Sequence, residues 1–165
     1  MLFIDIQNDI IENSCENYHI IDYRSNNIID CIIPNKLYIG SVDSNSIHIL
    51  NKYKITNVIC VEENQPIEYP NITYTHFPIN ERNPPKLIDV FNNVFDIIEK
   101  SEIILIYCYK GISRSAIFIC AYLMKKYNIS FQLAIRFLRD HRKYIDPNIS
   151  LINEILDYEE SLKIY

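Results

Sequence analysis

Hydrophobic residues follow two alternating patterns along the chain, which predict strands and helices in turn. The run EIILIY at 102–107 is short, apolar and rich in β-branched residues, as is typical of a strand covered on both faces of a parallel sheet. Longer segments carry apolar residues every three or four positions, as one face of a helix does. Strands that alternate with helices predict an α/β fold, with a central, mostly parallel twisted sheet and helices on both faces.

The pattern also places the individual elements. Strands are predicted at 36–40, 57–63, 72–79 and 102–107, and helices within 41–55, at 86–100, from 114 onward, at 130–141 and after Asn148. Ser130 and Asn148 are the predicted N-caps of the last two helices. The last helix is expected to face the core with Ile152, Ile155 and Leu156.

The 165 residues, 48% of them hydrophobic, suffice for one cored domain, which we place at 31–165. Residues 1–30 form an acidic N-terminal extension that contains six acidic residues and one basic residue, Arg24. Their net charge of −5 equals that of the whole chain. Paired isoleucines predict that part of the extension packs, for example as an accessory helix. The sequence leaves open whether it covers its own domain or exchanges with a second copy in a homodimer.

Composition also bears on location and partners. The start, MLFIDIQNDII, carries acids where a secretory signal has bases, and no stretch approaches the about 18 uncharged apolar residues of a membrane span. The five cysteines are scattered and lack the paired spacing of zinc or dithiol sites. We therefore expect a soluble cytoplasmic or nuclear protein that is not secreted and uses no metal or cofactor. The neutral charge balance after residue 30 disfavours nucleic acid as a partner.

The stretch YCYKGISRS at 107–115 carries the candidate chemistry. Cys108 follows a predicted buried strand, and a helix is predicted to begin near Arg114. In such a turn, successive backbone N–H groups converge on an anion, and the helix N-terminus adds its positive end. Gly111 permits the tight curl of the loop. We expect Cys108 to be a thiolate nucleophile, Arg114 to hold two phosphoryl oxygens, and Ser115 to donate its hydroxyl to the sulfur.

This Cys-x5-Arg-Ser motif resembles that of the cysteine-dependent protein tyrosine phosphatase superfamily, most closely its small dual-specificity phosphatases. The resemblance extends over about 32–160 and includes IIPNKLYIGS, ITNVICV, CYKGISRSAIFICAYLM and RKYIDPN. It implies a catalytic role for Cys108, Arg114 and Ser115. It also implies that the loop binds the substrate phosphate through Tyr109, Lys110, Gly111, Ile112, Ser113 and Arg114.

Two positions depart from the family pattern. The family has an aspartate general acid shortly after a proline that ends a strand, and here FPINER places Glu81 there. Asp89 is the nearest alternative carboxyl, but it lies in a predicted helix and is expected on a solvated face. Tyr107 replaces the usual histidine before the nucleophile. A phenol can donate a hydrogen bond but cannot become cationic, so we expect a less acidic thiol and slower turnover.

Other candidate residues have simpler interpretations. Cys60 and Cys120 lie within apolar patterns and are expected in the core, with a redox-resolving role as the alternative. The basic cluster RDHRK at 139–143 is expected to be a solvated helix end, with an influence on substrate choice as the alternative.

The resemblance implies a protein phosphatase that acts on phosphotyrosine and on phosphoserine or phosphothreonine through a cysteinyl-phosphate intermediate. The chain has no tryptophan and is too short for the extra segments of the large tyrosine-specific relatives, which implies a shallow site. One alternative is a phosphate-binding pseudophosphatase that acts as an interaction module. The other is a phosphatase for RNA 5′-phosphates or phosphoinositides, whose members usually have a more basic loop and threonine after the arginine.

Overall fold

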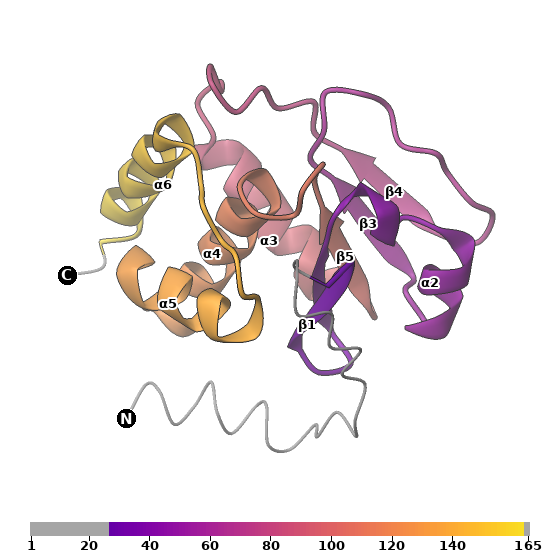
Figure 1. Ribbon diagram of the computed structural model, residues 1–165. Helices are drawn as coiled ribbons and strands as arrows, with labels where there is room; N and C mark the ends of the chain where they lie inside the picture. Colours follow the sequence, from indigo (N-terminus) through magenta and orange to yellow (C-terminus); the bar gives the residue numbers. More distant parts are fainter. Residues whose placement is uncertain (1–26, 164–165) are drawn as a thin grey trace.

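The computed structural model describes residues 27–163, which contain a five-stranded sheet (Figure 1). The strand order is β1-β2-β5-β3-β4. The strands are β1 (Ile29–Ile33), β2 (Leu37–Gly40), β3 (Asn57–Cys60), β4 (Thr73–His76) and β5 (Ile104–Tyr107). Only the pair β1–β2 is antiparallel among these strands. This arrangement confirms the predicted α/β fold with a mostly parallel sheet.

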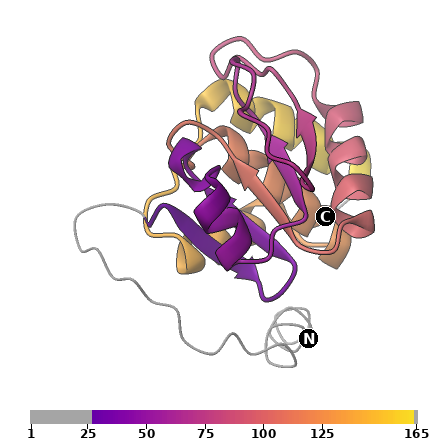
Figure 2. The same cartoon turned by 90° about the vertical axis from the view of Figure 1, so that its right-hand side faces the viewer.

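Helices cover both faces of the sheet, as predicted. They are the short 3-10 helix η1 (Val42–Ser44) and the α-helices α2 (Ile47–Lys52), α3 (Ile88–Lys100), α4 (Arg114–Tyr127), α5 (Phe131–His141) and α6 (Ile149–Leu162). Figure 2 shows α2, in purple, in front of the sheet and the orange and yellow helices behind it. The side chains therefore form two cores, a small one under α2 and a large one under α3 to α6.

The central strand β5 contributes to both cores because successive side chains of a strand point to opposite faces. Ile104 and Ile106 belong to the large core, whereas Leu105 and Tyr107 belong to the small one. All four residues are buried, which explains why the strand has a continuous apolar sequence.

The helix α4 lies at the centre of the large core. Each of its residues from Ser115 to Met124 is buried, and it packs against α3, α5 and α6. The predicted apolar face of α3 is confirmed, since Phe91, Val94 and Ile98 are buried. The predicted N-caps are also confirmed: Ser130 Oγ accepts a hydrogen bond from the N–H of Leu133, and Asn148 Oδ1 accepts one from that of Ser150.

The inward face of α6 differs from the prediction. Its buried residues are Leu151, Glu154, Ile155 and Tyr158, whereas Leu156 is 42% exposed. The prediction is confirmed for Ile155 and wrong for Leu156, and it missed Glu154 because an acidic residue suggests a solvent-facing position. Here the Glu154 carboxylate accepts a hydrogen bond of 2.9 Å from the N–H of Leu87, just before α3. Glu154 thus satisfies a backbone donor at a helix start, where no intrahelical acceptor is available.

The strand β1 precedes the first predicted strand and begins inside the segment assigned to the N-terminal extension. Its pairing with β2 is irregular, because the register shifts between Cys31 and Ile33. A shift of this kind interrupts the alternation of apolar and polar residues by which a strand is recognised. The expected accessory helix, and the homodimer through it, concern residues that lie outside the described range.

Candidate active site

The loop between β5 and α4 lies at the carboxyl end of the parallel strands, where α/β proteins usually bind ligands. Cys108 opens this loop and is 2% exposed. Gly111 has a φ of +66°, a conformation that favours glycine. A Cβ at Gly111 would lie 2.5 Å from the carbonyl oxygen of Gly40, at the end of β2. Gly111 is therefore required both for the curl and for the close approach of two backbones.

Four consecutive carbonyl groups of the loop accept hydrogen bonds from residues outside it. Two of the bonds come from backbone amides: Val42 N donates to Tyr109 O at 3.1 Å, and Asp146 N donates to Ile112 O at 3.0 Å. The other two come from the Arg142 guanidinium, whose Nη2 donates to Lys110 O at 3.4 Å and whose Nε donates to Gly111 O at 2.7 Å. A trans peptide points its C=O and N–H in opposite directions. The four bonds therefore turn the N–H groups of residues 110–113 toward the inside of the loop, where they can bind an anion.

A pocket of about 300 Å³ opens at this loop. Its lining residues are Glu81, Cys108, Tyr109, Lys110, Ile112, Ser113, Arg114, Asp146, Pro147 and Asn148. The structure thus brings together the predicted nucleophile, arginine and acid. Ser115 is fully buried, with its Oγ 3.1 Å from Cys108 Sγ, as the predicted hydrogen bond requires. Gly111 is buried and contributes only backbone groups.

Arg114 is held beside the pocket by two groups from other segments. Its Nη2 lies 2.9 Å from Glu62 Oε1, and its Nη1 donates to the carbonyl of Ile79 at 3.2 Å. Burial raises the pKa of the Glu62 carboxyl, and the charge of Arg114 opposes this rise. The buried Nε of Arg114 has no hydrogen-bond partner within residues 27–163. This spare donor suits an oxyanion, because buried polar groups are otherwise nearly always paired.

The two candidate acids occupy different surroundings. Glu81 lines the pocket and is partly exposed, whereas Asp89 is exposed in the first turn of α3 and does not line it. The second carboxylate at the pocket is instead Asp146, which sequence analysis missed. A signal for it was present, because Asp146 belongs to the segment RKYIDPN that carries part of the resemblance.

Tyr107, which stands where the family has histidine, is buried on the α2 side of the sheet, away from the large core that includes Cys108. Its hydroxyl lies 3.4 Å from Nδ2 of Asn45, whose Oδ1 accepts a hydrogen bond of 2.8 Å from the hydroxyl of Tyr74. Burial raises the pKa of the Tyr107 phenol well above its ordinary value. Tyr107 is therefore a neutral link between the sheet and the segment before α2.

Cys60, Cys120 and the basic cluster at 139–143 lie outside the lining of this pocket. Cys60 and Cys120 are buried core residues, as expected, and burial raises the pKa of both thiols. Cys60 belongs to the small core and Cys108 to the large one, on opposite faces of the sheet. The expectation of a solvated cluster at 139–143 is wrong for Arg142, which is 1% exposed. Its guanidinium is buried because the loop carbonyls and Asp30 are its partners.

Among residues 27–163, none of the helices is both long and apolar enough to cross a membrane. In the same residues, no group of three or more His, Cys, Asp or Glu side chains is placed to hold a metal ion.

Comparison with known proteins identifies the family. The family described as "Dual specificity phosphatase, catalytic domain" matches residues 37–161. A probable dual specificity protein phosphatase of Dictyostelium discoideum is 38% identical over 141 residues, which are 83% of this chain and 36% of the relative. Human dual specificity protein phosphatase 7 is 31% identical over 134 residues, 76% of this chain and 32% of the relative. The chain thus spans about a third of the length of these relatives.

Solved structures share the fold of this chain. Human DUSP28 has a TM-score of 0.74 at 22% identity, over 83% of this chain and 96% of that one. The human tyrosine phosphatase-like serine/threonine/tyrosine-interacting protein has a TM-score of 0.74 at 26% identity, over 81% of this chain and 96% of that one. The chain belongs to the dual specificity phosphatase catalytic domain family. The resemblance inferred from its sequence is confirmed.

Proposed function

We propose that this chain is a protein phosphatase that hydrolyses phosphotyrosine and phosphoserine or phosphothreonine through a cysteinyl-phosphate intermediate. One observation carries the proposal: Cys108, Arg114 and Glu81 line a single pocket whose loop amides point inward. Membership of the dual specificity phosphatase family supports it.

In the first step, the Cys108 thiolate attacks phosphorus, so that an S–P bond forms while the P–O bond to the substrate breaks. Glu81 begins protonated and gives its proton to the leaving oxygen, which departs as an alcohol or phenol. Arg114 and the N–H groups of residues 110–113 bind the other phosphoryl oxygens. They stabilise the charge of the transition state because they are already oriented before the reaction.

In the second step, the Glu81 carboxylate accepts a proton from a water molecule, whose oxygen attacks phosphorus. The S–P bond breaks and inorganic phosphate is released. The sulfur leaves as a thiolate, which Ser115 stabilises by a hydrogen bond across the 3.1 Å between Oγ and Sγ. Glu81 is then protonated again and ready for the next substrate.

A second pocket supports a protein rather than a small metabolite as substrate. Its volume is about 610 Å³, and it shares Tyr109, Lys110 and Ile112 with the catalytic pocket. Ile28, Val42 and Tyr144, which are 40–49% exposed, also line it. An exposed apolar surface beside a phosphate site suits the peptide that flanks a phosphorylated residue. It gives no comparable advantage to a free phosphate ester.

The test is turnover of an aryl phosphate and of matched phosphotyrosine and phosphothreonine peptides. Cys108→Ser is expected to abolish turnover while phosphopeptide binding remains. Unchanged turnover in this variant would refute the mechanism. Assays of a phosphoinositide and of 5′-triphosphorylated RNA test the other substrate classes, and preferential turnover of either would refute the protein-phosphatase assignment.

The second candidate is a phosphate-binding module without turnover. The observation that favours it is the Glu62–Arg114 ion pair, which already occupies part of the guanidinium that substrate needs. The phosphatase-like interacting protein among the similar structures has a name consistent with such a role. A single burst of product, or peptide binding with no product, would support this candidate.

The chemistry also indicates a compartment. A nucleophilic thiol requires reducing conditions, and Cys60, Cys108 and Cys120 form no disulfide in the described part of the chain. We therefore assign the reaction to the cytoplasm or nucleus.

A further inference from the structure

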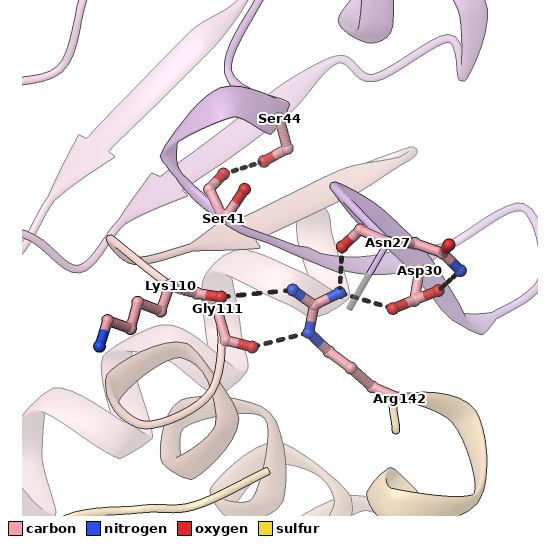
Figure 3. Close-up of polar contacts among 7 residues, drawn as sticks. All are labelled: Asn27, Asp30, Ser41, Ser44, Lys110, Gly111 and Arg142. Carbon is pink, nitrogen blue, oxygen red and sulfur yellow. Dashed lines mark hydrogen bonds and ion pairs between the residues drawn. The ribbon is translucent and has the colours of Figure 1, made fainter. Parts of the chain in front are cut away.

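Arg142 is a buried cation that contacts the catalytic loop from the side opposite to the anion site. It follows α5, and its side chain has no exposed surface. Its Nε donates to the carbonyl of Gly111 at 2.7 Å, and its Nη2 donates to that of Lys110 at 3.4 Å (Figure 3). These two carbonyls belong to the peptide units that carry the N–H groups of Gly111 and Ile112. Their orientation therefore fixes that of two inward amides.

The same guanidinium is bound to the N-terminal strand. Its Nη1 lies 2.5 Å from Asp30 Oδ2 and donates to the carbonyl of Asn27 at 2.8 Å (Figure 3). The other oxygen of Asp30 accepts a hydrogen bond of 2.7 Å from Asn27 Nδ2. Asp30 is thus oriented by its neighbour and in turn orients Arg142. Acceptors on two sides leave the planar guanidinium little freedom to rotate.

Asp30 also makes the buried charge tolerable. Burial lowers the pKa of the Arg142 guanidinium, and the Asp30 carboxylate opposes this effect. Removal of the partner of a buried cation strongly destabilises the folded protein, because the remaining charge is left uncompensated. Asp30 lies outside residues 37–161, the region that matches the family, so this contact comes from a part of the chain that the family match does not include.

We propose that Asp30 and Arg142 are positioning residues that hold the amides of Gly111 and Ile112 in the orientation that binds the phosphoryl oxygens. The proposal rests on the proposed function and deepens it, because it makes β1 part of the catalytic machinery. Asp30 acts on the loop only through Arg142, and Arg142 acts through the two carbonyls. The loop then stays preorganised before substrate binds.

The experiment compares Asp30→Asn and Arg142→Lys with the wild-type chain. Asparagine keeps the shape of Asp30 without its charge, and lysine keeps the charge of Arg142 without its fork of donors. Both are expected to lower kcat/KM for an aryl phosphate, and the affinity for tungstate measured by calorimetry, by about 10- to 100-fold, because small displacements of reacting groups are costly. Asp30→Glu restores the charge and is expected to recover most of the tungstate affinity.

Two controls separate positioning from a general loss of stability. Glu99→Gln removes the carboxylate of a surface pair with Lys126, 2.9 Å apart, and should leave both readouts unchanged. Ile155→Val trims the buried face of α6 and should lower the thermal midpoint without lowering tungstate affinity. Wild-type tungstate affinity in Asp30→Asn and Arg142→Lys would overturn the proposal. If the wild-type chain binds tungstate but turns over no aryl phosphate, the proposed function fails while tungstate binding still tests the positioning role.

Discussion

The Arg114 guanidinium and the Glu62 carboxylate form an ion pair of 2.9 Å beside the catalytic pocket, with side chains 11% and 13% exposed. The carboxylate comes from the segment just after β3 and the guanidinium from the start of α4, so the contact joins two segments at the carboxyl edge of the sheet. Burial raises the pKa of Glu62, which makes this contact sensitive to pH.

The sign of that sensitivity is a first prediction. Because its folded-state pKa is raised, the native chain binds a proton at Glu62 more readily than the unfolded chain does, and this contribution to stability falls as pH rises from about 4.3 through the folded-state pKa. Glu62→Gln removes the titration. The free energy of unfolding of the variant, minus that of the wild type, should therefore increase with pH. Urea unfolding at several pH values measures this difference, and a constant difference would contradict the prediction.

The general acid gives a second prediction. Glu81→Gln cannot donate a proton, so kcat on an aryl phosphate should fall by about 10²- to 10⁴-fold, and the basic limb of the pH profile should disappear. Asp146→Asn is the matched control, since Asp146 also lines the pocket. If Asp146→Asn rather than Glu81→Gln removed the limb, Asp146 would be the acid.

A third prediction concerns Gly111→Ala, which we expect to disturb the loop. Gly111 has a φ of +66°, and an added Cβ would meet the Gly40 carbonyl. The left-handed conformation alone costs about 1–2 kcal/mol. The variant should unfold at a lower temperature and lose tungstate binding. Asn128→Ala, at another positive φ outside the loop, should lose stability but keep binding. Tungstate binding by Gly111→Ala at wild-type affinity would show that the loop tolerates a Cβ.

The position before the nucleophile gives a fourth prediction. Tyr107→Phe removes a hydroxyl that lies 3.4 Å from Asn45 Nδ2 and is on the opposite side of the sheet from the large core. We expect a loss of about 1 kcal/mol in the free energy of unfolding, the typical net value of one hydrogen bond. The kcat on an aryl phosphate should change little. A large loss of kcat without a loss of stability would assign the phenol a part in the chemistry.

A fifth prediction concerns Glu154, which is 8% exposed and accepts the N–H of Leu87. Glu154→Ala leaves that buried donor unpaired and should cost about 1–3 kcal/mol in a urea titration. Asp157→Ala removes a neighbouring acid that pairs with Lys86 at the surface, and should cost much less. Equal losses of the free energy of unfolding in the two variants would mean that the hydrogen bond to Leu87 does not contribute more to stability than the surface pair.

The fold and the catalytic loop could be predicted because their signals are local. The helix α3 shows its buried face as a regular apolar repeat, and β5 shows its burial as an apolar run. Cys108, Gly111, Arg114 and Ser115 all lie within one strand–loop–helix unit, so residues that are close in the sequence are also close in space.

The supporting residues could not be predicted in this way because their contacts are long-range. Asp30 and Arg142 are 112 positions apart in the sequence. Arg142 lies in the basic cluster at 139–143 and Asp30 is one of six acids in the first 30 residues, so each suggests a solvated surface. Glu62 likewise looks like one of two ordinary acids after a strand. Only the folded chain shows that these charges are partners of the loop or of Arg114.

The two glycines of the chain, Gly40 and Gly111, meet backbone to backbone. The end of β2 and the catalytic loop are therefore mutually fitted surfaces, although 71 positions separate them in numbering. A designer who transplanted the loop alone into another α/β scaffold would have to reproduce the backbone path of this strand end as well. Phosphate affinity in such a graft should depend on the strand backbone opposite Gly111 as much as on the grafted segment itself.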